Sequence, residues 1–153
     1  MKITQAWLAA AALAVGAGAA QAQDFDNQLK ARQGQFRIMA LNLGVLGGMA
    51  RGTVDYDAEM ARMAAENIAT IASLHQGAMW PEGSDNMELD GTRALPSIWD
   101  DNADFLSKWG AMGEAANSLV AVAADGQQGL GPAVGALGDA CGACHEAHRQ
   151  PSE

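Results

Sequence analysis

The sequence predicts an all-α protein, an antiparallel four-helix bundle of up-down-up-down order. Apolar residues recur at helical spacing in four segments, and no run alternates apolar and polar residues as a half-buried strand would. Most links between these segments are short, which favours antiparallel neighbours. A chain of 153 residues, 49% of them hydrophobic and 18% charged, has the size and composition of one folded domain.

Residues 1–22 are typical of a signal peptide for export. Lys2 supplies a positive charge, an apolar run follows, and an Ala-Gln-Ala triplet ending at Ala22 has the small-x-small pattern of a cleavage site. The alternative, a membrane anchor, is disfavoured because the run is shorter than the ~20 apolar residues that span a bilayer. We therefore expect cleavage after Ala22, which leaves residues 23–153 as the mature domain.

The first predicted helix covers about residues 24–51, and the second covers about residues 57–78. Asp57 is a favourable N-terminal cap for the second helix, and both segments show the spacing of bundle helices. The stripes predicted to be buried are Leu29, Phe36, Leu43 and Ala50, interleaved with Arg32, Met39 and Leu46, in the first helix, and Met60, Ala64, Asn67, Ile71 and Leu74 in the second.

The third helix is predicted from after Pro96 to about residue 125, and the fourth from about Pro132 to Arg149. Proline is tolerated in a first helical turn. The loop at residues 76–96 is too long for a tight connection, so we expect it to cover something. The predicted stripes are Ile98, Phe105, Met112 and Leu119, beside Asn102, Trp109, Ala116 and Ala123, and then Val134, Leu137, Cys141, Cys144 and His148.

The charge balance argues against nucleic acid as a partner. The chain has 9 Lys and Arg against 18 Asp and Glu, for a net charge of −9, which repels phosphate backbones. A basic redox partner would suit such an acidic protein.

Residues 141–145 carry the clearest chemical signal in the chain. Cys141-Gly-Ala-Cys144-His145 matches C-x-x-C-H, the attachment signal for c-type haem. On a helix, positions i and i+3 lie on the same side, so each cysteine can form a thioether with one vinyl group of a single haem. His145 can direct an imidazole nitrogen to the iron from that side. The motif predicts one covalent haem c with His145 as its axial iron ligand.

Other interpretations of the cysteine pair have less support. A disulfide is the default for two cysteines in an exported protein, and a thioredoxin-like redox pair needs a strand before the motif, which the pattern does not show. A zinc site needs further ligands, and only His75 and His148 remain as histidines.

The chain resembles the cytochrome c prime family along essentially the whole mature sequence. The C-terminal position of the haem motif is discriminating, because ordinary small cytochromes c carry it near the start. The resemblance is carried by Ala31-Arg32-Gln33 with Met39, by Leu95-Pro96-Ser97-Ile98-Trp99 with Phe105, and by C-x-x-C-H-x-x-x-R ending at Arg149.

The resemblance implies a five-coordinate haem iron whose sixth position is blocked by an apolar residue of the first helix. Aligned on residues 31–33, that residue is Phe36, which cannot bind iron. Low-spin relatives have methionine there and act as conventional electron carriers. Met39 lies one turn from Phe36 and is either core filler or, on a rotated helix, a sulfur ligand.

The resemblance also implies roles for polar residues around the haem. Arg32 stands at a core-type position, where an unpaired charge is costly, and the family pairs it with a haem propionate. The alternative is a side chain that snorkels to solvent. Gln33, Thr92 and Arg93 are expected at the haem edge on position alone.

Two residues near the end of the chain are expected beside the haem. Arg149 matches a family arginine near the proximal face, and its alternative is a solvated helix end. His148 stands where the family usually has tyrosine or phenylalanine, so we expect a group that titrates near the haem. His75 is expected at the surface.

These expectations predict a periplasmic high-spin haem protein that binds nitric oxide and carbon monoxide and takes part in electron transport. The alternative is a low-spin carrier with methionine as the sixth ligand. A peroxidase-like enzyme would need a distal acid–base residue, and none is present near Phe36, so we expect no catalytic residue. The family often forms homodimers through its first two helices, which the sequence leaves open here.

Overall fold

The computed structural model describes residues 25–151, and the predicted signal peptide lies outside this part of the chain. No strand occurs among the described residues, which confirms the all-α prediction, and none of the described helices is long and apolar enough to cross a membrane. The elements are α1 (Asp26–Ala50), α2 (Ala58–Ala72), the 3-10 turn η1 (Gly77–Met79), the short α3 (Ser97–Asp100), α4 (Asn102–Val122) and α5 (Gln127–His148).

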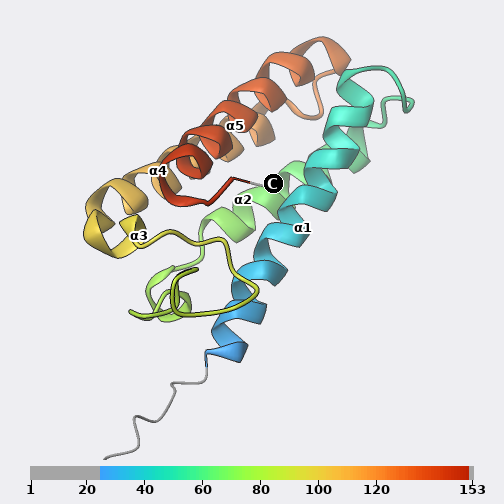
Figure 1. The fold of residues 1–153 in the computed structure, drawn as a ribbon. Coiled ribbons are helices and arrows are strands. Elements are labelled where there is room, and N and C mark those ends of the chain that lie inside the picture. The colour runs from blue at the N-terminus through green and yellow to red at the C-terminus, as the bar shows by residue number, and fades with distance from the viewer. Residues whose placement is uncertain (1–24, 152–153) are drawn as a thin grey trace, which may run out of the picture.

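The helices α1, α2, α4 and α5 form the predicted antiparallel bundle (Figure 1). Each helix packs against two others: α1 and α4 both contact α2 and α5. Short links join α1 to α2 and α4 to α5, whereas the long connection between α2 and α4 carries η1 and α3. This connection lies beside the N-terminal half of α1, at one end of the bundle.

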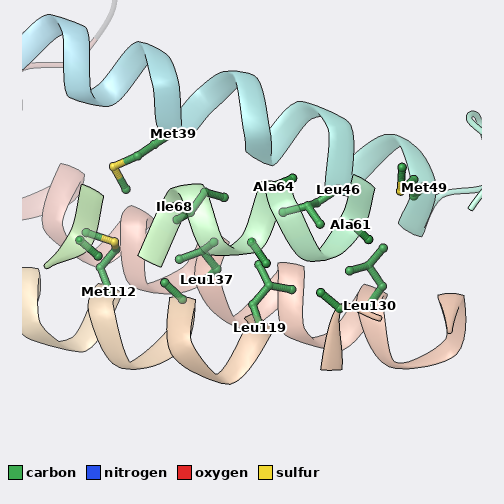
Figure 2. Packing of buried hydrophobic residues seen from close by; sticks show 14 of the residues in the cluster. Met39, Leu46, Met49, Ala61, Ala64, Ile68, Met112, Leu119, Leu130 and Leu137 are labelled. Atoms are coloured by element: carbon green, nitrogen blue, oxygen red, sulfur yellow. The ribbon is translucent and has the colours of Figure 1, made fainter. Parts of the chain in front are cut away.

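The core lies along the bundle axis, where all four long helices contribute side chains (Figure 2). Leu46, Leu119 and Leu130 are fully buried. Burying one such side chain contributes about 1.5–3 kcal/mol to folding. Because α2 presents mainly alanines to this core, α1 and α4 can approach it closely.

The prediction for the second helix is wrong in part: Ala64 is buried as predicted, but three other members of the predicted stripe are exposed, and the helix ends before residue 78. Met60 and Leu74 are exposed, and α2 ends at Ala72. The chain turns there because Gln76 is buried and its side chain hydrogen-bonds to Gln35, with a donor–acceptor distance of 3.1 Å. The buried residues of α2 are Ala61, Ala64, Ala65, Ile68 and Ala72.

The third predicted helix is broken at Asp101, while its stripe is confirmed. Asp101 has φ −130° and ψ 63°, and its carboxylate caps α4 by accepting a hydrogen bond from the Asp104 amide at 3.2 Å. Asn102 is exposed, and the other members of the stripe are buried: Ile98, Phe105, Trp109, Met112, Ala116, Leu119 and Ala123.

The fourth helix begins earlier than predicted, so Pro132 lies inside it rather than in its first turn. The start is fixed by Tyr56, whose hydroxyl accepts a hydrogen bond from the Gly126 amide at 3.0 Å and donates one to the Ala123 carbonyl at 2.8 Å. A contact with the α1–α2 connection therefore sets where α5 begins.

Candidate functional site

A cavity of about 500 Å³ opens at the end of the bundle that the long connection covers. Its walls come from the N-terminal half of α1, the loop at residues 91–94, the first half of α4 and the C-terminal turns of α5. Most of the lining is apolar. Its volume is within the range of cofactor sites in proteins.

Every residue that the sequence predicts for the site lines this one cavity, although the residues come from three separate parts of the chain. They are Arg32, Gln33 and Phe36 on α1, Thr92 and Arg93 in the loop, and Cys141, Cys144, His145 and Arg149 at the end of the chain.

The C-x-x-C-H motif lies on the last turns of α5. Cys141 and Cys144 are half-buried free thiols, and burial raises the pKa of both. Burial also lowers the pKa of His145, and the charges of Arg149 and Arg93 lower it further. His145 therefore favours the neutral imidazole, which is the form that binds a metal.

The three alternatives for the cysteines find no support among the described residues. The motif lies within helix α5 rather than after the strand of a thioredoxin-like unit, and no group of three or more His, Cys, Asp or Glu among residues 25–151 is placed to hold a metal ion. The cysteines are not joined by a disulfide.

Phe36 borders the cavity from α1 and lies between two indole rings, but it is 38% exposed, so the prediction that it is buried is wrong. Its ring makes edge-to-face contacts with Trp80 and Trp109, at centroid distances of 6.5 and 6.1 Å. The Trp109 indole donates a hydrogen bond to the Ala72 carbonyl at 2.9 Å, and the Trp80 indole donates one to Gln76 at 2.9 Å. These hydrogen bonds hold both indole rings in place, and the indole rings in turn restrict the movement of the Phe36 ring.

Met39 is buried in the main core, and its side chain also borders the cavity. Figure 2 shows it at one end of the core cluster. The side chain thus fills core space, as the sequence suggests, at the boundary with the site.

Arg32 is 2% exposed, so it does not snorkel to solvent. Its guanidinium donates hydrogen bonds to the hydroxyl and the carbonyl oxygen of Ser84, both at 3.1 Å, and lies 4.6 Å from the ring centroid of Trp80. Its Nε has no hydrogen-bond partner, and no carboxylate among the described residues forms an ion pair with it. Burial lowers its pKa. A buried guanidinium beside an apolar cavity needs an anionic partner, and an anionic group of a cofactor bound in the cavity would supply it.

The loop at residues 91–94 is tied to both neighbouring helices. Gln33 donates a hydrogen bond to the Gly91 carbonyl at 2.9 Å, and the Gln150 amide donates one to the Arg93 carbonyl at 2.8 Å. The Thr92 hydroxyl accepts a hydrogen bond from the Ala94 amide at 3.1 Å. These contacts hold the loop against α1 on one side and against the end of α5 on the other.

His148 also borders the cavity and is buried. Its Nδ1 lies 3.0 Å from the Ser97 hydroxyl, and its Nε2 lies 3.0 Å from the carboxylate of Asp104. Its ring packs edge-on against Phe105 at a centroid distance of 5.7 Å. The imidazole of His148 thus stands where the family usually has tyrosine or phenylalanine, and both of its nitrogens have a polar partner. His75 is exposed, as expected.

Sequence reasoning did not assign Trp80, Trp109 or Lys108 to the site, although all three line the cavity. Trp109 could have been found, because its stripe on the third predicted helix is clear. Trp80 lies in the irregular connection, where no periodicity indicates which way a side chain faces. A lone tryptophan in a polar, breaker-rich segment is the one signal that could have suggested it.

A helical bundle whose last helix presents C-x-x-C-H to an apolar cavity defines a class, the c-type haem proteins with a C-terminal haem motif. The family model described as Cytochrome C' matches residues 27–149. The chain belongs to this family, and its cofactor is covalently bound haem c. The resemblance stated from the sequence is confirmed.

Relatives and solved structures agree with this assignment. The chain is 40% identical over 138 residues to cytochrome c-554 of Cereibacter sphaeroides, covering 90% of each protein. It is similar to the structure of cytochrome c' from Rhodobacter sphaeroides with a TM-score of 0.81 and 33% identity, covering 84% of this chain and 99% of that one.

Gas complexes are known for one of the structural relatives. A variant of cytochrome c prime from Alcaligenes xylosoxidans, solved as its nitric oxide complex, matches with a TM-score of 0.73 and 30% identity, covering 85% of this chain and 98% of that one. Another variant of the same protein was solved with carbon monoxide bound.

Proposed function

We propose that this chain is a periplasmic high-spin haem protein whose five-coordinate iron binds nitric oxide and carbon monoxide, and that it takes part in electron transport. One observation carries the proposal: Phe36, a side chain that cannot coordinate iron, borders the cavity and is held there by Trp80 and Trp109. The nitric oxide and carbon monoxide complexes of the Alcaligenes relative support the choice of ligands.

The attachment roles follow from the motif on α5. Cys141 and Cys144 would each form a thioether, and the neutral imidazole of His145 would supply the axial nitrogen. When bound, the haem supplies an iron that exchanges one electron and binds diatomic ligands. Arg149, with its guanidinium 3.4 Å from the His145 Nε2, would act on the proximal face.

The polar edge of the cavity would hold the haem propionates. Arg32 has a buried guanidinium that lacks an anionic partner, and a carboxylate suits its geometry. Gln33, Thr92 and Arg93 line the same side of the cavity, between α1 and the end of α5.

The side chains beside Phe36 favour nitric oxide over dioxygen as a ligand. Met39 and Leu43 continue the lining along α1, and neither they nor Phe36 carries a hydrogen-bond donor. A polar iron–dioxygen unit needs such a donor to be stable, whereas nitric oxide needs it less. The same apolar stripe lacks the acid–base residue of a peroxidase, so we propose a non-enzymatic protein.

The second candidate is a low-spin electron carrier with a methionine ligand. It is favoured by the position of Met39, which borders the cavity one turn from Phe36. Visible spectra of the purified ferric and ferrous protein separate the two functions. A high-spin ferrous spectrum that changes on adding carbon monoxide supports the first proposal, and a sharp low-spin spectrum that ignores it supports the second.

We also propose export by residues 1–22 and a homodimer formed through α1 and α2. Exposed apolar side chains on these two helices, Ile38 and Leu41 on α1 and Met60 and Met63 on α2, support the dimer. Analytical ultracentrifugation of the mature protein tests it, with Leu41→Asp expected to shift the protein toward the monomer.

A further inference from the structure

Cationic side chains are concentrated around the cavity in a chain that is otherwise strongly acidic. The sequence has 9 Lys and Arg against 18 Asp and Glu. Five of the cations line the cavity, and no Asp or Glu of the described residues lines it: the cations are Arg32, Arg37, Arg93, Lys108 and Arg149. The charged side chains that line the cavity are therefore opposite in sign to the net charge of the whole molecule, although exposed carboxylates such as Glu88 and Asp90 lie on the same connection.

Three of these cations are exposed and have no carboxylate partner within residues 25–151. Lys108 is paired with Asp104, and Arg32 is buried against Ser84. The remaining residues, Arg37, Arg93 and Arg149, form what we call the arginine rim, and none of the ion pairs among the described residues includes them.

The arginine rim is held as one surface although its residues come from three segments. Arg37 lies one turn after Gln33 on α1, and Gln33 is hydrogen-bonded to the loop at Gly91. The Arg93 carbonyl is bonded to the chain just after Arg149. Burial lowers the pKa of Arg149, and the charge of Arg93 lowers it further. Two unneutralised like charges are thus kept side by side.

The rim would keep a positive charge when the cofactor is bound. This step rests on the proposed function, because it places the haem in this cavity. A haem brings two propionate carboxylates, which is fewer than the five cations around the cavity. Arg32, buried with an unpaired Nε, is the first partner for one of them. The exposed guanidinium groups of the rim would then lie at the cavity lining through which an electron would enter or leave.

We propose that the arginine rim is the docking surface for a redox partner protein with an acidic face. The net charge of −9 suggests a basic partner instead. At physiological salt, however, charges more than about 8 Å apart are largely screened, so a docking partner responds mainly to the side chains nearest the cavity mouth, where the arginine rim lies. The rim orients an acidic partner at the haem edge and repels a basic one.

Charged small reductants test the sign of the field at the haem edge. The ferric holoprotein is reduced with the iron(II)–EDTA dianion and, separately, with the hexaammineruthenium(II) dication, over a range of ionic strengths in a stopped-flow instrument. We expect the rate with the dianion to fall as salt is added and the rate with the dication to rise. The opposite pattern, which the net charge would give, overturns the proposal.

Substitutions then locate the field. Arg37→Gln removes a rim charge from an exposed position and should slow reduction by the dianion about three- to fivefold at low salt, as Coulomb's law gives for a dianion about 7 Å from the lost charge. Arg51→Gln is the matched control, because Arg51 is also exposed but follows the other end of α1. Equal effects of the two variants would contradict the rim.

A titration that involves no electron transfer gives a second readout. Amide resonances of the diamagnetic ferrous carbonyl form are followed while a hexaglutamate peptide is added. We expect shifts at residues 91–94 and around Arg37, which disappear at high salt and are reduced in Arg93→Gln. Shifts confined to other surfaces overturn the proposal.

The visible spectrum distinguishes failure of the proposed function from failure of the arginine rim. A protein without haem or with low-spin haem contradicts the proposed function. A high-spin protein with the wrong salt dependence contradicts only the rim.

Discussion

Replacing Phe36 by alanine is expected to open the cavity to gas ligands. The phenyl ring borders the cavity and packs edge-on against Trp80 and Trp109. With haem in the cavity, a ligand that approaches from this side would have to displace the ring, and displacement would break both aromatic contacts. The Phe36→Ala protein has no ring to displace.

The size of the effect follows from these two contacts. An edge-to-face aromatic pair contributes about 0.5–1.5 kcal/mol beyond its buried area, so the two pairs together add about 1–3 kcal/mol to the cost of moving the ring. Removing that cost from the activation barrier raises the association rate of carbon monoxide by about 5- to 150-fold.

The assay is stopped-flow mixing of the ferrous protein with carbon monoxide, followed in the Soret band. Leu41→Ala is the control, because Leu41 is on the same helix but is 70% exposed and does not line the cavity. Phe36→Leu should give an intermediate rate, since it keeps an apolar side chain without the ring contacts. A rate for Phe36→Ala equal to that of Leu41→Ala would show that Phe36 does not limit entry.

Further expectations concern the core, the attachment and the pH response. Leu119→Ala, which leaves a cavity at a fully buried position on α4, should lower the free energy of unfolding by about 2–5 kcal/mol in guanidinium titrations. Leu106 is exposed on the same helix, so Leu106→Ala should change the free energy of unfolding by less than about 0.5 kcal/mol. Equal losses in the two variants would contradict the packing. Replacing both Cys141 and Cys144 by alanine should let acidified acetone extract the haem, and haem that stays with the protein would refute thioether attachment. The pKa of Asp104 is lowered, mainly by its hydrogen bond to Lys108; its contribution to stability is therefore present above the unfolded pKa of about 4 and lost as the pH falls through the lower folded pKa. Asp104→Asn should thus destabilise the protein near neutral pH and lose less stability than the wild type on acidification, and parallel urea-unfolding profiles would contradict this.

The parts of the fold that follow from local chemistry were predictable from the sequence. The apolar residues from Ile98 to Ala123 recur at helical spacing, and this spacing is enough to predict which face is buried. The Asp57 side chain caps α2 as expected, accepting a hydrogen bond from the Met60 amide at 2.8 Å. The haem motif is equally local, because its residues share one side of one helix.

The features that the sequence did not predict depend on contacts between distant segments. Tyr56 sets the start of α5, and the buried Gln76 sets the end of α2. Met60 and Leu74 were wrongly predicted to be buried because methionine and leucine carry a strong hydrophobic signal, whereas the alanines that form most of the buried face of α2 carry a weak one. The contacts of Phe36 with Trp80 and Trp109 were not predicted, because Trp80 lies in an irregular segment whose side-chain directions have no periodic pattern.

Resonance Raman spectroscopy of the ferrous protein tests the central claim most directly. A haem held by His145 alone, with no protein ligand on the side that Phe36 borders, gives an iron–histidine stretching band that shifts on iron isotope substitution and is lost when carbon monoxide binds. A spectrum of six-coordinate low-spin haem that lacks this band would contradict the account. If Met39→Leu then converts the haem to the five-coordinate form, methionine is the ligand that occupies the sixth position.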